Sequence, residues 1–118
     1  MAYTDLIVWQ RSVMLGIRVY QLTAAFPKSE TYGMTAQMRK AATSIAVNIA
    51  EGYGRETTGE YLNQLSAARG SLFELQTFFI FARALKYITK AQYARFAQTM
   101  KDIERMLARL RTSLRRKR

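Results

Sequence analysis

The spacing of apolar residues in the last quarter of the chain restricts the fold more than any other feature. From residue 96 to residue 114, the large apolar side chains alternate intervals of four and three residues. They are Phe96, Met100, Ile103, Leu107, Leu110 and Leu114. This period predicts a helix with one apolar seam that packs against other helices, as in a coiled coil or a helical bundle.

Two further helices are predicted in the first half of the chain. We expect one at residues 5–25, capped by Thr4 or Asp5. Pro27 ends it, because the residue before a proline avoids the helical conformation. The other is expected at about residues 34–51, where many small residues would let a neighbouring helix approach closely. Both helices carry apolar residues at helical spacing, so both should bury one side.

Two capping signals divide the second half of the chain. Thr57 with Glu60, and Thr89 with Gln92, have the spacing of a capping box, in which each side chain bonds a free backbone N–H at the helix start. We therefore expect a third helix from Thr57 to about Tyr87 and a fourth helix that starts after Thr89 and carries the apolar seam.

Four amphipathic helices joined by short connections predict an all-α fold, an antiparallel up-down-up-down four-helix bundle. A chain of 118 residues has room for one domain, so we expect residues 1–118 to form a single bundle with a basic end that frays from about residue 111. No apolar run approaches the roughly 18–20 residues of a membrane span, and the first residues lack the pattern of a signal peptide. We expect a cytoplasmic protein.

The third helix is apolar in too many directions for a lone bundle. Between residues 72 and 82, several apolar side chains point away from the side that should face the core. They are Phe73, Phe78, Ile80 and Phe81. We interpret them as an oligomer interface, with an unusually deeply buried third helix as the alternative. Gly70, in the same helix, is interpreted as a point of close approach to a facing helix, or else as a kink.

The charge of the chain is concentrated at its C-terminal end. The chain has 19 Lys and Arg against 8 Asp and Glu, a net charge of +11, yet residues 105–118 supply seven basic side chains and no acid. These seven are Arg105, Arg109, Arg111, Arg115, Arg116, Lys117 and Arg118. Opposite an apolar seam, they predict contact with a polyanion, and we take them as candidate nucleic-acid-binding residues. Weaker candidates are Arg39, Lys40 and Arg69. The alternative is a solvated helix end that the helix dipole favours.

The sequence contains no His and no Cys. Their absence removes thiolate nucleophiles, His general bases and Cys/His metal sites, so we predict no catalytic residue, no metal, no cofactor and no enzymatic activity. Asn48, Glu51 and Arg55 form the most unusual polar group. We interpret them as a structural group at the junction of the second and third helices, with a functional polar site as the alternative.

Several segments resemble one known family. They are residues 6–10, 26–33, 37–52, 60–62, 68–72 and 85–87, and the run Ser-Ile-x-x-Asn-Ile-Ala-Glu-Gly at 44–52 is the most specific. The chain resembles the four-helix bundle protein family, whose members are also called 23S rRNA intervening-sequence proteins, over about residues 6–87. Ala46 departs from the proline that the family commonly has there, which predicts a straighter second helix.

The resemblance implies an antiparallel bundle that can assemble into a ring-shaped homopentamer. The fold is also similar to that of the accessory protein of diversity-generating retroelements, a basic pentamer that binds nucleic acid and a reverse transcriptase. Two hypotheses follow. One is an oligomer that binds RNA or DNA with little sequence specificity, and the other is a scaffold for a nucleic-acid-associated protein. A third hypothesis, a helix lying on an anionic membrane surface, is disfavoured by the continuous seam of the last helix.

Overall fold

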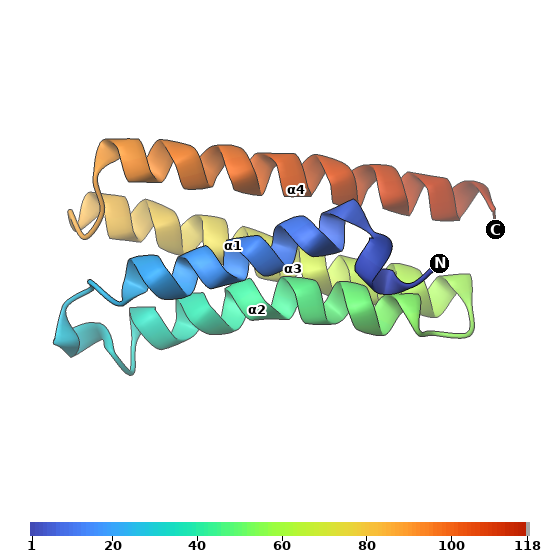
Figure 1. Cartoon of the computed structure of the whole chain (residues 1–118), viewed down its shortest axis with the longest axis horizontal. Coiled ribbons are helices and arrows are strands. Elements are labelled where there is room, and N and C mark those ends of the chain that lie inside the picture. The colour runs from blue at the N-terminus through green and yellow to red at the C-terminus, as the bar shows by residue number, and fades with distance from the viewer. Residues whose placement is uncertain (118) are drawn as a thin grey trace.

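The computed structural model describes residues 1–117, and within that range the chain is all-α, with four helices and no strand. The elements are the 3₁₀ turn η1 (Tyr3–Asp5), α1 (Ile7–Thr23), the 3₁₀ turn η2 (Lys28–Glu30), α2 (Met34–Tyr53), α3 (Thr58–Ala84) and α4 (Lys90–Arg116). The four helices lie side by side along the longest axis of a body of 46 × 24 × 20 Å (Figure 1). The predicted all-α class is confirmed.

Figure 1 also shows how the chain connects these helices. Both chain ends and the α2–α3 connection lie at one end of the body, and the α1–α2 and α3–α4 connections lie at the other. Around the body, α1 contacts α2, α2 contacts α3, α3 contacts α4, and α4 contacts α1. The α1–α4 pair is the least closely packed of the four.

A single apolar core runs between all four helices. Its largest fully buried side chains include Leu15, Met38, Ile45, Leu72, Phe79 and Ile103. The predicted seam of α4 faces this core, with Met100 and Leu107 also buried, and Phe96, Leu110 and Leu114 packed partly against it. Phe79 and Phe96 stack with ring centroids 4.8 Å apart, which ties α3 to the start of α4. Among residues 1–117, no helix is both long and apolar enough to cross a membrane.

The start of α1 differs from the prediction. Neither Thr4 nor Asp5 caps α1, whose N-cap residue is Leu6 and has no side-chain bond to the helix. The carboxylate of Asp5 instead accepts from the backbone N–H of Ala2 at 2.9 Å, within η1. Because the Asp5 carboxylate is bonded within η1, it does not cap α1, which begins at Ile7, two residues later than expected.

Of the two predicted capping boxes in the second half of the chain, the one at Thr89 and Gln92 forms in full and the one at Thr57 and Glu60 forms only its threonine bond. Thr57 Oγ1 accepts from the N–H of Glu60 at the start of α3. At the start of α4, Thr89 Oγ1 accepts from the N–H of Gln92, and Gln92 Oε1 accepts from the N–H of Thr89. This reciprocal pair is the predicted capping box, so α4 begins where the sequence indicated.

The end of α3 comes earlier than the predicted Tyr87. Lys86 adopts φ 62°, and the N–H groups of Lys86 and Tyr87 donate to the carbonyls of Arg83 and Ala82. This is the Schellman pattern, with a lysine in the left-handed position where glycine is usual, so α3 ends at Ala84. Because the usual glycine is absent at this position, the amino-acid sequence does not indicate the end of α3.

The close-approach glycine is in α2 rather than in α3. Gly70 is exposed, and a Cβ added there would meet nothing within 4 Å, so the predicted close approach at Gly70 to a facing helix of this chain is wrong. Gly52, by contrast, is buried in the last turn of α2, where a Cβ would lie 2.8 Å from the Tyr61 ring and 3.0 Å from Cβ of Gln64. The α2–α3 corner thus depends on the absence of a side chain at Gly52.

Candidate nucleic-acid interface

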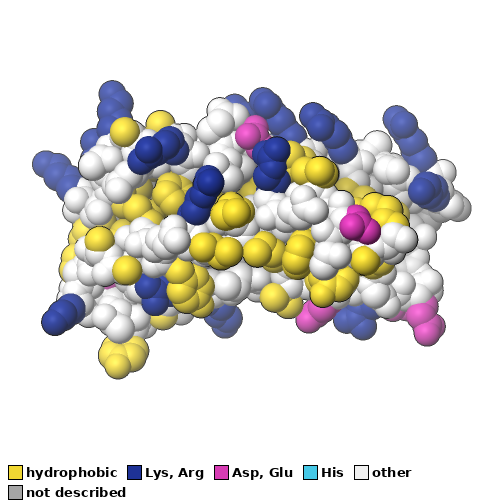
Figure 2. All heavy atoms as spheres, viewed as in Figure 1, with side chains coloured by type: hydrophobic (Ala, Val, Ile, Leu, Met, Phe, Trp, Pro, Cys, Tyr) yellow, Lys and Arg dark blue, Asp and Glu magenta, His cyan; other side chains and the backbone are white. Residues whose placement is uncertain are grey.

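The basic residues of α4 lie on the side away from its buried seam. The basic face, as we call it, consists of the exposed residues Arg105, Arg109, Arg115, Arg116 and Lys117. The helix remains regular through Arg116, so Arg105, Arg109 and Arg116 share one solvent-facing side, whereas Arg115 lies in the neighbouring row that Arg111 begins and Lys117 follows the last turn. In Figure 2, Lys and Arg side chains project from the part of the surface that α4 forms, with few acidic side chains beside them.

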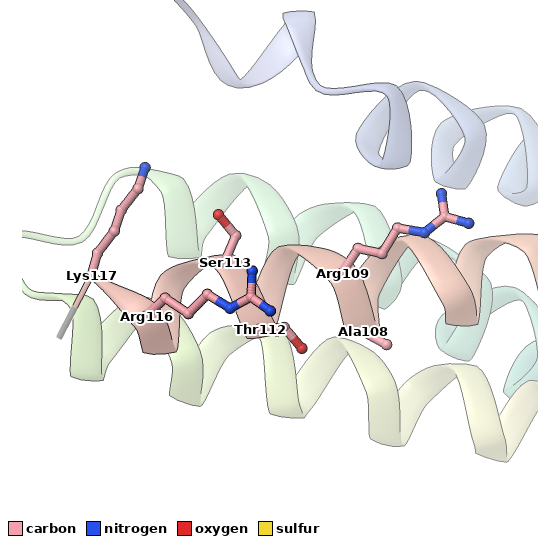
Figure 3. A pocket seen from close by; sticks show the side chains of 6 residues that line it. All are labelled: Ala108, Arg109, Thr112, Ser113, Arg116 and Lys117. Atoms are coloured by element: carbon pink, nitrogen blue, oxygen red, sulfur yellow. The ribbon is translucent and has the colours of Figure 1, made fainter.

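Three of these cations line a shallow hollow on the last turns of α4 (Figure 3). The hollow has a volume of about 590 Å³ and is lined by Ala108, Arg109, Thr112, Ser113, Arg116 and Lys117. Arg109 and Arg116 are two helical turns apart, about 10.5 Å at 1.5 Å per residue. Guanidinium, ammonium and hydroxyl groups are the usual donors to phosphate oxygens, and the hollow offers all three kinds.

Arg111 does not belong to the basic face. It is half-buried against α3, where one guanidinium nitrogen donates to Ser66 Oγ at 3.2 Å and Nε is buried without a hydrogen-bond partner among residues 1–117. Burial, together with the nearby charges of Arg115 and Arg69, lowers the pKa of Arg111 below its ordinary value. Arg111 is therefore a contact between α4 and α3. Arg118 lies outside the described residues.

The three weaker candidates lie on other helices. Arg39 of α2 donates hydrogen bonds to two oxygens of α1, Thr23 Oγ1 at 2.9 Å and the Tyr20 carbonyl at 3.2 Å. Its guanidinium also lies 4.6 Å from the centroid of the Tyr20 ring. Lys40 is exposed beside it, and α2 is not a neighbour of α4. Arg69 of α3 lies over the Phe73 ring at 4.7 Å. The structure therefore does not gather all the predicted cations into one patch.

A basic furrow between α1 and α4 was not predicted. Two adjoining hollows, of about 540 Å³ and 400 Å³, share Leu15, Arg18 and Thr99 in their lining. The remaining lining residues are Gln21, Leu22, Gln92, Arg95 and Phe96 in the first, and Gln10, Arg11, Met14, Asp102 and Ile103 in the second. We call these two hollows the α1–α4 furrow. The only sign in the sequence is the seven-residue interval between Arg11 and Arg18, which places both on one side of α1.

The predicted oligomer interface on α3 is partly exposed. Ile80 and Phe81 are 57% and 55% exposed, whereas Phe73 and Phe78 are half-buried, and Phe78 packs partly against the core. A second apolar surface, which sequence reasoning missed, is a groove of about 410 Å³ between α1 and α2. Its lining is Ser12, Val13, Gly16, Ile17, Tyr20, Gln21, Thr43, Ala46 and Val47, none of which carries a charge. Figure 2 shows a band of hydrophobic side chains across this side of the body.

The polar group predicted at the α2–α3 junction is more open than expected. The side-chain amide of Asn48 donates to the Ser44 carbonyl one turn earlier in α2 at 2.9 Å. Glu51 and Arg55 are exposed. No hydrogen bond within residues 1–117 joins the three side chains, and the buried contact at this corner is the packing of Tyr61 on Gly52.

Comparisons with known proteins identify the family. The solved structure of a protein of unknown function from the S23 ribosomal protein family of Bacteroides thetaiotaomicron superposes with a TM-score of 0.81, at 21% identity, over 89% of this chain and 98% of that chain. Comparison with curated proteins gives no match. The family described as 23S rRNA-intervening sequence protein matches residues 4–109, nearly the whole chain. The resemblance inferred from the sequence motifs is thus confirmed, and the chain belongs to the 23S rRNA-intervening sequence protein family.

Proposed function

We propose that this chain is a non-enzymatic, cytoplasmic, antiparallel up-down-up-down four-helix bundle that binds RNA or DNA as a homo-oligomer. The observation that carries the proposal is the division of α4 into a buried apolar seam and an exposed basic face. Because the seam fixes α4 on the bundle, the cations along its other side are presented in a constant order. Such a surface attracts a polyanion.

The contacts we propose are with phosphates rather than with bases. The hollow on α4 offers cations and hydroxyl groups, which position a nucleic-acid backbone but do not read its sequence. Binding should therefore tolerate many sequences and weaken steeply as salt concentration rises, since each neutralised phosphate releases bound counterions.

Self-association is part of this proposal, and two exposed apolar surfaces support it. Ile80 and Phe81 of α3 leave apolar surface open to solvent, and the groove between α1 and α2 offers a second apolar surface on the same chain. A copy that places its α3 on the groove of the next copy would cover both surfaces. The family resemblance suggests a pentameric ring, in which five basic faces would bind one long polyanion with added avidity.

The test of nucleic-acid binding uses substitution rather than removal of the C-terminal residues, because Leu107 is buried in the core. The variant is Arg105→Gln, Arg109→Gln and Arg116→Gln. Its matched control is Lys28→Gln, Arg55→Gln and Lys90→Gln, three exposed cations outside the basic face and the furrow. Both variants lose three positive charges, so the comparison separates position from net charge.

We expect the wild type and the control to bind labelled RNA and DNA, and the basic-face variant to bind about tenfold or more weakly at moderate salt. Titrations at several salt concentrations measure this difference. Equal affinity of the two variants would remove the basic face from the proposal. Absence of any binding by the wild type would reject the nucleic-acid function altogether.

A protein-interaction scaffold is the second candidate, and the uncharged groove between α1 and α2 favours it. Such a groove is suited to an apolar helix of another protein as well as to a second copy. This function predicts a defined protein that co-purifies with the wild type and is lost when Ile17→Glu changes the groove, while free RNA and DNA do not bind.

A further inference from the structure

The α1–α4 furrow has the charge and lining of a binding site for a polyanion. Arg11 and Arg18 lie on its α1 side and Arg95 on its α4 side, and all three are exposed. Asp102 is the one acid among the lining residues, and its Oδ1 already accepts from Gln98 at 2.9 Å. Three arginines thus face a hollow with one carboxylate that is already hydrogen-bonded.

The furrow also has an apolar floor. Leu15 and Ile103 are fully buried beneath it, and Phe96 is half-buried, with its ring stacked on Phe79. Glutamine amides line the furrow at both ends, through Gln10 in one hollow and Gln92 in the other. Proteins that hold single-stranded nucleic acid without reading its sequence combine a positively charged groove with aromatic side chains, and Phe96 is the aromatic residue in the lining of this furrow.

The position of the furrow follows from the loose packing of α1 on α4, the least closely packed pair of neighbouring helices. From Gln92 to Ile103 the α4 wall is about 16 Å long at 1.5 Å per residue. Arg95 and Asp102, and then Arg109 and Arg116, follow one another at intervals of seven residues, which places them on nearly the same side of α4. The furrow therefore leads along α4 toward the hollow shown in Figure 3.

We propose that the α1–α4 furrow binds a single strand of nucleic acid, with the guanidinium groups of Arg11, Arg18 and Arg95 on consecutive parts of its phosphate backbone. This inference rests on the proposed nucleic-acid function and gives it a location outside the basic C-terminal end. The lining of both hollows comes from α1 and α4 alone, and we expect such a groove between two neighbouring helices to admit one strand, whereas a duplex would contact only the outer basic face.

The test compares two variants that lose equal charge. The furrow variant is Arg11→Gln, Arg18→Gln and Arg95→Gln, and the control is the Lys28→Gln, Arg55→Gln and Lys90→Gln variant. The probe is a labelled single strand of about 20 nucleotides and mixed sequence, with the matching duplex as a second probe. Because all six residues are exposed, we expect both variants to keep the wild-type circular dichroism spectrum.

We expect the furrow variant to bind the single strand about tenfold or more weakly than the control does. The plot of log affinity against log salt should also become less steep by about two, since each of the three lost phosphate contacts with a single strand contributes about 0.7 to its slope. Duplex binding should change much less. If the wild type binds the single strand and the furrow variant binds it as well as the control does, the furrow is not the site, although the proposed function stands. If the wild type binds no nucleic acid, both proposals fail.

A second measurement leaves the charges intact. A photo-crosslinking residue at Met14, which is 48% exposed and lines the furrow, should become covalently attached to the bound strand on irradiation. The same residue at Val47, in the uncharged groove between α1 and α2, should not. A crosslink at Val47 with none at Met14 would place the strand elsewhere and overturn the inference.

Discussion

α3 and α4 are helices of equal length that expose opposite kinds of side chain to water, apolar on α3 and basic on α4. Each has 27 residues, each begins behind a threonine cap, and each buries one side in the common core. Outside the core, α3 exposes Ile80 and Phe81, whereas α4 exposes the arginines of its basic face. The buried sides hold the bundle together, and the outer sides are the basis of the two kinds of partner proposed above.

The two outer surfaces favour different partners for a physical reason. Apolar surface on α3 is stabilised when another protein surface removes it from water, by about 25 cal/mol for each Å². Clustered cations on α4 are well solvated, and they are best neutralised by a polyanion that releases its counterions. The comparison therefore predicts that changes on α3 alter self-association, and that changes on α4 alter ligand binding.

The largest expected effect concerns the apolar core, to which both helices contribute buried side chains. Phe79→Ala on α3 should lower the free energy of unfolding by about 3–5 kcal/mol, and Leu107→Ala on α4 by about 2–5 kcal/mol, because both side chains are fully buried and leave cavities. Denaturant-induced unfolding measures both values. A cost well below 1 kcal/mol for Leu107→Ala would show that α4 is not a full member of the core.

A smaller effect should separate the outer sides. Phe81→Asp on α3 places a charge in the proposed interface between copies, and we expect it to weaken self-association about tenfold or more, since burying such a side chain contributes about 1.5–3 kcal/mol. Light scattering should report a mass well above 13.6 kDa for the wild type and a lower mass for the variant. Arg105→Asp on α4 is the matched control and should leave the mass unchanged. A monomeric wild type would contradict the interface.

The smallest expected effect concerns the two glycines. Gly70→Ala should raise the free energy of unfolding by about 0.5–1 kcal/mol, because alanine loses less backbone entropy than glycine when the helix forms and its Cβ would meet no neighbour. Gly52→Ala is the contrast and should be destabilising, since its Cβ would meet the Tyr61 ring at 2.8 Å. If Gly70→Ala instead lowers the mass measured by light scattering, Gly70 lies in the contact between copies.

Much of the fold could be predicted because its signals are local. The seam from Phe96 to Leu114 and the Thr89–Gln92 capping box depend on residues a few positions apart, and both are present in the structure. The stop at Lys86 could not be predicted, because a lysine rarely adopts a positive φ and its neighbours impose that conformation. Asp5 also departs from the prediction, because its carboxylate accepts from the N–H of Ala2 within η1 and not from the first turn of α1.

The candidate site likewise has some features that local sequence patterns predict and others that depend on tertiary packing. By itself, the sequence determined that the chain forms four helices, that the charge gathers at the end of the last one, and that the motifs are those of its family. Only the tertiary structure decided that Arg111 is half-buried on Ser66, that Gly70 is open, and that Arg11 and Arg18 share a furrow with Arg95. Helical periodicity fixes which residues of one helix share a side. Which sides of different helices become neighbours depends on how all four pack at once.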